Sequence, residues 1–421
     1  MWIAVFVLAL AARGAWGTWQ LVRAENTAAL EFPDEDQYWL MARSLANGDG
    51  LKDELGFRAT RMPLYPALLA PFTQLANGVV VAKVLHWVVG AAVAALTALA
   101  AGTMLGPRAG WLAGLLVAVD PFLVFFSSLL LTETLFAGVL VALLWAAWPI
   151  MLPVGRHDAP AEAGRPGRAT GTFYRRWIGV AVLAAIAVYV RESAFGLVLL
   201  LLLLMLLSRR FDGRSVVAAL ITGGAVLMSL LPWAARNRAV TGDWCWLTHR
   251  GGISLYDGVR PGATGSSDLG GIKQMPAVRG LAEAEWNRYF LDRSFEAIRD
   301  EPGRILRLAG VKLSRMWNPF PNVETYQSSL ARVVSAAWTL PTFALALAGA
   351  ILLPMSDRYV GWRMAFLLLL PALYLSALHS VFVGSVRYRL GAVPMLEILA
   401  AVALVALIRR LTRSKDASEP T

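Results

Sequence analysis

Long apolar runs alternate with short polar segments along this 421-residue chain, and the alternation sets the expected architecture. A helix needs about 20 predominantly apolar residues to cross a bilayer. The runs predict membrane helices, some of them short, at 2–21, 79–105, 111–126, 130–152, 177–190, 195–207, 216–235, 331–353, 362–380 and 390–408. The pattern therefore predicts an all-α polytopic membrane protein with about ten transmembrane helices, within a range of about nine to twelve.

Three runs leave the exact topology open. Residues 111–126 and 130–152 are two spans, or one broken pair around Asp120-Pro121. Residues 62–77 are interrupted by Pro71, and we expect them to re-enter the membrane surface rather than cross it. The run at 2–12 is interpreted as part of an uncleaved first helix, with the core of a signal peptide as the alternative.

The polar segments divide the chain into four parts. Residues 1–235 form an N-terminal membrane region, which includes a first outer loop at 23–61 and a basic loop at 153–176. The basic loop is rich in Pro, Gly and Arg, a composition typical of a disordered cytoplasmic linker. Residues 236–330 form a small soluble or interfacial region on the outer face, 331–410 form the last membrane helices, and 411–421 form a cytoplasmic tail.

Composition and charge placement support this reading. The chain is 57% hydrophobic and only 16% charged, with a mean hydropathy of +0.56. Its net charge of +11 lies largely in short loops and at helix ends, where it indicates membrane orientation and lipid contact rather than nucleic-acid binding. Basic short loops stay in the cytoplasm, so both termini are expected there, with the polar clusters on the outer face of the plasma membrane. A single cysteine excludes an internal disulfide.

The first outer loop carries three consecutive acids, Asp34, Glu35 and Asp36. A helix is expected to start at Pro33 or Asp34, because the apolar positions from 38 to 45 follow the helical spacing. The acids then cap an interfacial helix, or Asp34 is a catalytic base held at the membrane edge. There the low dielectric is expected to raise the pKa of the carboxyl group.

Other charged residues are expected at the same outer level as Asp34. They are Glu133 at the start of a span, Arg191 with Glu192 between two spans, and Arg387 with Tyr388 before the last span. Each has a structural alternative: a helix cap, a solvated ion pair or an interfacial side chain. For the arginines the functional alternative is a ligand site for phosphate, because arginine pairs well with phosphate oxygens. For Glu133 it is the orientation of a substrate or the binding of a divalent ion.

Taken in order, these residues resemble a known family, the polytopic GT-C glycosyltransferases of the protein O-mannosyltransferase and aminoarabinose-transferase-like group (glycosyltransferase family 39 type). The resemblance rests on the 32–38 acid motif, the Arg61-Met-Pro-Leu-Tyr65-Pro run, Thr132-Glu133, Arg191-Glu192, Leu-Pro-Trp-x-x-Arg-Asn at 231–237, and Arg387-Tyr388 with Pro394. It covers roughly residues 1–410, and it implies a GT-C-like helical bundle.

The resemblance implies transfer of a sugar from a polyprenyl-phosphate donor to an acceptor hydroxyl of a lipid, glycan or protein. Asp34 would be the base of an inverting displacement, and Glu35 the second catalytic carboxylate, which would orient donor or acceptor or help to hold a metal. Arg61, Arg191 and Arg387 would bind the donor phosphate, with Tyr65, Glu133, Glu192 and Tyr388 also contacting substrate. No cofactor is certain; a divalent cation held by Asp34 and Glu133 is the option left open.

Two other functions use the same residues. A transporter or lipid flippase would line a translocation path with these acids and arginines, and a membrane scaffold would not use them chemically. A transporter is expected to carry polar groups near the bilayer midplane, whereas here they fall at one surface. A scaffold gives no reason for the acids and arginines to converge. The sequence therefore favours the glycosyltransferase.

Overall fold

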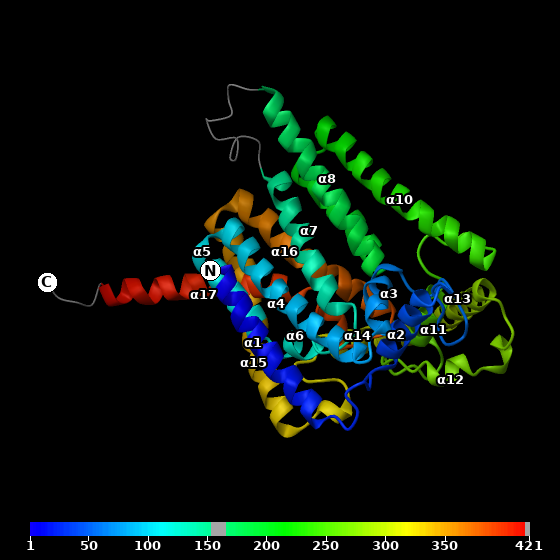
Figure 1. Cartoon of the computed structure of the whole chain (residues 1–421). Helices are drawn as coiled ribbons and strands as arrows, with labels where there is room; N and C mark the ends of the chain where they lie inside the picture. The colour runs from blue at the N-terminus through cyan, green and yellow to red at the C-terminus, as the bar shows by residue number, and fades with distance from the viewer. Residues whose placement is uncertain (153–165, 417–421) are drawn as a thin grey trace.

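The protein is described by a computed structural model that covers residues 1–152 and 166–416, and within these ranges its regular secondary structure is entirely helical (Figure 1). The long helices are α1 (Trp2–Arg23), α4 (Gly78–Leu105), α5 (Pro107–Val119), α7 (Glu133–Met151), α8 (Pro166–Val190), α9 (Ala194–Ser208), α10 (Gly213–Thr241), α15 (Ser329–Ser356), α16 (Arg358–Val381) and α17 (Val393–Asp416). The predicted all-α membrane architecture is confirmed.

Seven of the described helices are long and apolar enough to cross a membrane: α1, α4, α7, α10, α15, α16 and the part of α8 from Gly171. The helices α5 and α9 are apolar but shorter. At Asp120, α5 ends and α6 (Pro121–Phe126) begins, and the Asp120 carboxylate caps α6 by accepting a hydrogen bond from the Leu123 N–H group. The alternative of a helix pair broken at Asp120-Pro121 is therefore the one observed within 111–126.

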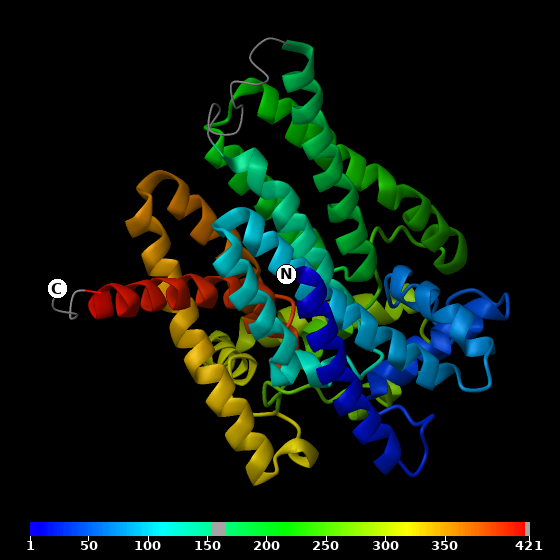
Figure 2. The ribbon, with the colours of Figure 1, turned by 60° about the vertical axis from the view of Figure 1, so that its left-hand side comes forward.

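One end of the bundle gathers the basic turns. Arg363 near the start of α16 donates hydrogen bonds to the carbonyls of Met151 at the end of α7 and Ser208 at the end of α9. Arg209 donates to the carbonyl of Leu152, again joining the ends of α7 and α9. We call this the basic end, and the opposite end, where α7 begins and α16 finishes, the cavity end. The C-terminal part of α17 projects beyond its neighbours in two views (Figures 1 and 2).

Small residues let the helices approach closely. A Cβ atom at Gly349 of α15 would lie 1.9 Å from the Leu399 carbonyl oxygen of α17. A Cβ atom at Gly110 of α5 would lie 2.6 Å from the Ala98 carbonyl oxygen of α4. Contacts of this kind replace the hydrophobic effect in membrane helix packing, where lipid is as apolar as the side chains.

Two sequence-based expectations about connecting segments meet different outcomes. Residues 64–74 form only α3 (Leu64–Leu69) and the 3₁₀ turn η1 (Ala70–Gln74), which are too short to cross a bilayer, as expected. The basic loop at 153–176 is shorter than expected, because α8 already begins at Pro166. Apolar residues follow from 177 onward, so the helix extends backward from them by two to three turns. Residues 153–165 and the end of the tail at 417–421 lie outside the described residues.

The segment between α10 and α15 covers the cavity end. It contains α11 (Gly251–Val259), α12 (Gly270–Lys273), α13 (Glu283–Asp300) and α14 (Pro302–Met316), and it lies beside α2 (Pro33–Ala46) in Figure 1. A small core joins Ile253, Trp286 and Phe290. The Glu283 carboxylate accepts hydrogen bonds from the N–H groups of Arg58 and Ala59, so it fixes the first polar loop to this segment.

Candidate active site

The acidic motif divides its side chains between two roles. Phe32 is the N-cap of α2, with Pro33 in the first turn, so the helix starts two residues earlier than an Asp34 cap would give. Glu35 is fully buried and accepts hydrogen bonds from the N–H groups of Glu31, Phe32 and Leu130. Glu35 thus closes the helix start and ties it to the segment before α7. Burial raises the pKa of the Glu35 carboxyl group.

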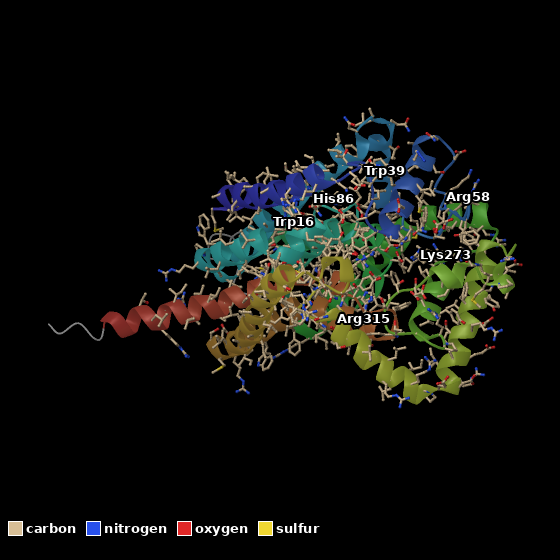
Figure 3. All side chains as sticks on the ribbon, turned by 90° about the horizontal axis from the view of Figure 1, so that it is seen from below. Trp16, Trp39, Arg58, His86, Lys273 and Arg315 are labelled. Atoms are coloured by element: carbon tan, nitrogen blue, oxygen red, sulfur yellow. The ribbon has the colours of Figure 1, made fainter. Side chains whose placement is uncertain are left out.

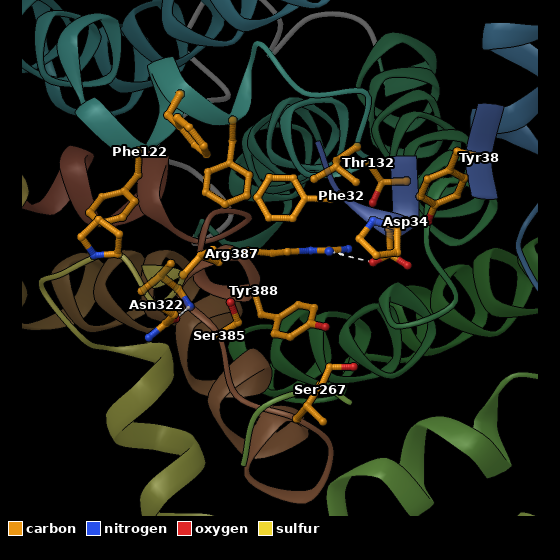
Figure 4. Close-up of a pocket in the computed structure, with 18 of the residues that line it drawn as sticks. Phe32, Asp34, Tyr38, Phe122, Thr132, Ser267, Asn322, Ser385, Arg387 and Tyr388 are labelled. Atoms are coloured by element: carbon orange, nitrogen blue, oxygen red, sulfur yellow. Dashed lines mark hydrogen bonds and ion pairs between the residues drawn. The ribbon is translucent and has the colours of Figure 1, made fainter. Parts of the chain in front are cut away.

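Asp34 points the other way and is surrounded by arginines. Arg387 donates from Nη1 to Asp34 Oδ2 at 2.7 Å, and Figure 4 shows its side chain extended toward Asp34. Arg61 pairs with Asp34 Oδ1, and Arg250 Nη2 lies 3.6 Å from the same oxygen. Both of these arginines also donate to the Gln37 side-chain oxygen, at 2.9 and 3.1 Å. One turn of α2 therefore orients two arginines toward one carboxylate.

Glu133, the first residue of α7, is a second carboxylate bound by arginines. Its Oε1 atom accepts a hydrogen bond from Arg387 Nε at 2.7 Å and from Arg191 Nη1 at 3.2 Å. Arg387 therefore bridges Asp34 and Glu133. We call the group of Asp34, Glu133, Arg61, Arg191, Arg250 and Arg387 the charged centre.

The arginines change the expected acidity of Asp34. Burial alone would raise the pKa of its carboxyl group, but the nearby Arg61, Arg387 and Arg250 guanidinium groups hold that pKa well below its usual range. The sequence-based expectation of a raised pKa is therefore wrong. It considered the low dielectric of the membrane edge and had no means of knowing that three cations would converge on one carboxylate.

The charged centre opens into a cavity of about 2180 Å³. One apolar arm descends between α1, the α5–α6 segment and α15; it is lined by side chains including Ala12, Trp16, Val124, Phe125, Leu330 and Val334. A polar arm reaches α11 and α12, where Ser254, Asp257, Ser267 and Lys273 line the wall. Figure 3 shows Lys273 and Arg58 toward one end of the molecule, with Trp16 farther along among the helices. The cavity thus joins a hydrophobic groove, a cationic centre and a polar entrance.

The sequence-predicted site residues fall into two groups. Those that line the cavity are Asp34, Arg61, Arg191, Glu192, Arg387 and Tyr388. Glu133 lies behind them, almost fully buried, and is joined to them through its arginine partners. Glu35 and Tyr65 are set apart from the cavity wall; the Tyr65 hydroxyl is hydrogen-bonded to His86 Nε2 at 3.0 Å.

The Glu192 carboxylate differs from those of Asp34 and Glu133, which are bound by arginines. It lines the cavity close enough to act electrostatically on Arg61 and Arg250. Within residues 1–152 and 166–416, its carboxylate makes no hydrogen bond or ion pair. It is therefore an acid that faces the cavity without a fixed partner.

Sequence reasoning missed Arg250 and Gln37. Arg250 directly precedes the Gly251-Gly252 run, which by itself is a weak signal for a site. Gln37 lies inside the acidic motif but is uncharged, so it attracted no functional interpretation. Their position was available only from the fold, which brings α11 against α2.

The divalent cation left open by the sequence has no ready-made ligand set among the side chains that the structure describes. Among the described side chains, no group of three or more His, Cys, Asp or Glu residues could hold a metal ion. Asp34 and Glu133, the two acids expected to contribute, are both bonded to Arg387, whose guanidinium lies between them.

The resemblance of this chain to known proteins lies in its structure. No family model matches the chain, and no curated protein matches it. A solved structure of the oligosaccharyltransferase AglB from Archaeoglobus fulgidus, in complex with an inhibitory peptide and a dolichol-phosphate, aligns with a TM-score of 0.60 and 14% identity. That alignment covers 100% of this chain and 52% of AglB, so the chain spans about half the length of that protein.

This chain has the GT-C fold of membrane glycosyltransferases. A second AglB structure, with zinc and sulfate, gives a TM-score of 0.57 at 12% identity, over 97% of this chain and 49% of that one. ArnT from Cupriavidus metallidurans, bound to undecaprenyl phosphate, aligns more distantly, with a TM-score of 0.44 and 17% identity over 96% of this chain and 78% of ArnT. The AglB alignments confirm the fold expected from the ordered motifs.

Proposed function

We propose that this protein is a membrane glycosyltransferase that moves a sugar from a polyprenyl-phosphate donor to an acceptor hydroxyl. The observation that carries the proposal is the charge gathered at the charged centre and Glu192. Four arginines, Arg61, Arg191, Arg250 and Arg387, meet three carboxylates, those of Asp34, Glu133 and Glu192, beside an apolar groove. These seven side chains together carry one excess positive charge, which one phosphodiester neutralises.

The chemistry requires cations more than it requires an acid. When the bond between the sugar C1 atom and the phosphate oxygen breaks, the departing polyprenyl phosphate gains a negative charge. Preorganised guanidinium groups stabilise such developing charge, and removing one donor of this type typically costs about 10²–10³ in rate. A phosphate leaves without protonation, so one base on the acceptor side is sufficient, in contrast to the two carboxyl groups of a glycosidase.

Asp34 is the proposed base. The acceptor oxygen forms the new bond to C1 while its proton passes to an Asp34 oxygen, and the single displacement inverts the anomeric centre. A carboxylate held at low pKa by arginines is a weak base. The donor phosphate competes with Asp34 for Arg387 and Arg61, so donor binding restores basicity to Asp34 as the acceptor arrives.

The two arms of the cavity suit the two substrates. The groove along α1, the α5–α6 segment and α15 has the apolar lining that a polyprenyl chain requires, and it ends at the charged centre. This matches the lipid phosphates named with the AglB and ArnT structures, dolichol-phosphate and undecaprenyl phosphate. The polar arm at α11 and α12 admits a hydroxyl-bearing acceptor from the aqueous side. The acceptor is a lipid, glycan or protein.

We also infer the orientation from charge. At the basic end, Arg209 lies in the short turn between α9 and α10, and Arg358 and Arg363 lie in the first two turns of α16; Arg409 and Arg410 follow near the end of α17. Because basic short loops favour the cytoplasmic side, the termini are cytoplasmic and the cavity faces the outside of the plasma membrane. A transporter would need polar groups along a path through the bilayer, whereas this centre lies at one end.

The experiment uses the full-length protein in detergent with short-chain polyprenyl-phosphate sugars and a mixed pool of lipid, glycan and peptide acceptors. Release of polyprenyl phosphate is measured for the wild type, Asp34→Asn and Asp49→Asn. Asp49 is an exposed acid after α2 that pairs only with Lys52 among the described residues, so it is the matched control. We expect turnover in the wild type and in Asp49→Asn, and a loss of about 10²–10⁴-fold in Asp34→Asn.

Two outcomes would contradict the proposal. Equal turnover in the wild type and in a folded Asp34→Asn variant would remove Asp34 as the base. Failure of the wild type to release polyprenyl phosphate from any donor, with no sugar transferred, would contradict the glycosyltransferase itself.

A further inference from the structure

The turn that carries Arg387 is held from the side opposite the cavity. It is the 3₁₀ turn η4 (Val386–Arg389), which connects the end of α16 to α17. Arg387 and Tyr388 line the cavity, and both are drawn in Figure 4. Arg389, two residues on, is 1% exposed and points into the protein. The two arginines of this turn therefore have separate surroundings.

Two basic side chains cross between α14 and this region in opposite directions. Lys312 of α14 is completely buried, and its Nζ donates to the carbonyl of Val381, the last residue of α16, at 2.6 Å. Arg389 donates from Nη1 to the carbonyl of Met316, the last residue of α14, at 3.0 Å, and to that of Asn318 at 2.6 Å.

Each of these contacts is a helix C-cap. The last carbonyls of a helix have no partner within the helix and lie at the negative end of its dipole. Lys312 thus caps α16 from α14, and Arg389 caps α14 from η4. We call this pair the reciprocal clasp.

Backbone packing around the clasp leaves little freedom. A Cβ atom at Gly384 would lie 2.2 Å from the Lys312 carbonyl oxygen, so α14 rests directly on the backbone just before η4. Asn322, after α14, accepts the Val386 N–H hydrogen bond at 2.6 Å. The Arg389 guanidinium also lies over the rings of Phe122 and Phe343, at 4.8 and 5.2 Å from their centroids.

We infer that Lys312 and Arg389 are positioning residues that aim Arg387 at the donor phosphate. The inference rests on the proposed function and adds a role for α14, which supplies none of the six residues of the charged centre. Arg387 must keep its guanidinium in line with Asp34 and Glu133 at once, and a supporting shell is what usually secures such placement. The clasp adds two side chains to the Asn322 contact and to Arg315 of α14, whose Nε donates to the Gly384 carbonyl at 3.3 Å, in holding this four-residue turn at the rim of a large cavity.

The test measures phosphate preference, defined as the affinity for a short-chain polyprenyl phosphate divided by the affinity for the matching polyprenol. The ratio cancels losses of folded protein and of apolar binding. In Arg389→Met and in Lys312→Met, we expect the ratio to fall about tenfold, the size typical of removing a supporting shell. The matched control is Arg307→Met, an exposed arginine of the same helix, which should leave the ratio unchanged.

A double-mutant cycle separates positioning from general support. If Arg389 acts through Arg387, then adding Arg389→Met to Arg387→Met lowers the ratio no further. Independent, additive losses, or an unchanged ratio in folded Arg389→Met and Lys312→Met, would overturn the clasp. Should Arg389→Met fail to fold, Lys312→Met and Arg389→Lys carry the same test, with Arg389→Lys expected to retain most of the preference.

The clasp and the proposed function fail in different ways. If the wild type itself has no phosphate preference, or if Arg387→Met retains it, the donor site is misassigned. If Arg387→Met loses the preference while the clasp variants keep it, only the clasp is wrong.

Discussion

Two groups of buried charges lie within this helical bundle, and they differ in balance and in access. The charged centre, with Glu192 beside it, combines four arginines with three carboxylates and opens into a cavity of about 2180 Å³. The second group consists of Arg13, Asp120, Arg389 and Glu397, whose side chains interact electrostatically and are all almost fully buried. We call it the sealed cluster, because the void that Asp120 and Arg389 line measures only about 10 Å³.

The difference separates charge that a ligand can reach from charge that is enclosed by the fold; Arg389 belongs to the enclosed group and acts on the charged centre only through η4. In the sealed cluster two cations lie with two carboxyl groups, and backbone and tryptophan groups hydrogen-bond with Arg13, Arg389 and Asp120, whereas both Glu397 oxygens are buried without a hydrogen-bond partner among the described residues. Arg13 donates to the carbonyls of Ala9, Val117 and Ala118, and Trp338 donates to Asp120. In the charged centre, an excess cation remains and a ligand can reach it. Ionisable residues at membrane depth are often interpreted as functional. Here the net charge of each group and its access to a ligand indicate that the charged centre is the functional one.

The largest effect should come from removing the arginine that bridges the two acids of the charged centre. Arg387→Met leaves Asp34 and Glu133 without their shared partner and removes a donor to the leaving phosphate. We expect kcat for sugar transfer to fall by about 10²–10³. Turnover per folded enzyme and the thermal unfolding midpoint are the measurements, with Arg307→Met on the exposed face of α14 as the control. A folded Arg387→Met with wild-type kcat would mean that the cationic wall is not used in the reaction.

The sealed cluster should respond in the opposite way. Asp120→Ala removes the cap of α6 and leaves the indole N–H group of Trp338 buried without its acceptor. Loss of a cap costs about 1 kcal/mol, and a buried unpaired donor about 1–3 kcal/mol. The thermal midpoint should therefore drop clearly, while kcat of the remaining folded protein stays unchanged. A loss of kcat without a loss of stability would place Asp120 in the catalytic machinery.

The contrast also explains what the sequence could predict. The helices and the cavity-end position of Asp34, Arg191 and Arg387 follow from apolar run lengths and from charges at the ends of those runs. Arg13 and Glu397 lie inside predicted spans, and their partners come from helices distant in sequence, so no local pattern pairs them. The prediction of a raised pKa for Asp34 failed for the same reason, because Arg61, Arg250 and Arg387 reach its carboxylate only through tertiary contacts. The local sequence pattern predicts the helices and where they end. The charge balance of each buried group depends on contacts that only the fold creates.

A pH series tests whether the arginines truly hold Asp34 ionised. A carboxylate with a lowered folded-state pKa stabilises the protein above the pKa of the unfolded chain, near 3.8, and loses that contribution as pH falls below it. The thermal midpoint of the wild type should exceed that of Asp34→Asn by about 2–4 °C at neutral pH, corresponding to about 1 kcal/mol. The gap should narrow below pH about 4. A gap that widens on acidification would show that Asp34 is not held by cations.

Glu35→Gln tests the division of roles inside the acidic motif. The buried Glu35 carboxylate accepts three backbone hydrogen bonds and is set apart from the cavity wall. The amide retains only one acceptor oxygen, so we expect about 1–2 kcal/mol of lost stability, with kcat per folded enzyme unchanged. The measurements are the thermal midpoint and single-turnover rates at saturating donor. A fall in kcat like that of Asp34→Asn would return Glu35 to the catalytic role that its sequence neighbourhood suggested.

The smallest effect separates two tyrosines that the motifs treated alike. Tyr65 is 2% exposed and its hydroxyl is hydrogen-bonded to His86, whereas Tyr388 lines the cavity beside Arg387. Tyr65→Phe should cost about 1 kcal/mol of stability, the net value of one hydrogen bond, and should leave the donor KM unchanged. Tyr388→Phe should leave stability unchanged and raise the donor KM by about threefold to tenfold, because a hydrogen bond to substrate is worth about 0.5–1.5 kcal/mol. The reverse pattern would mean that the donor reaches α3, and that the cavity wall at η4 serves only the fold.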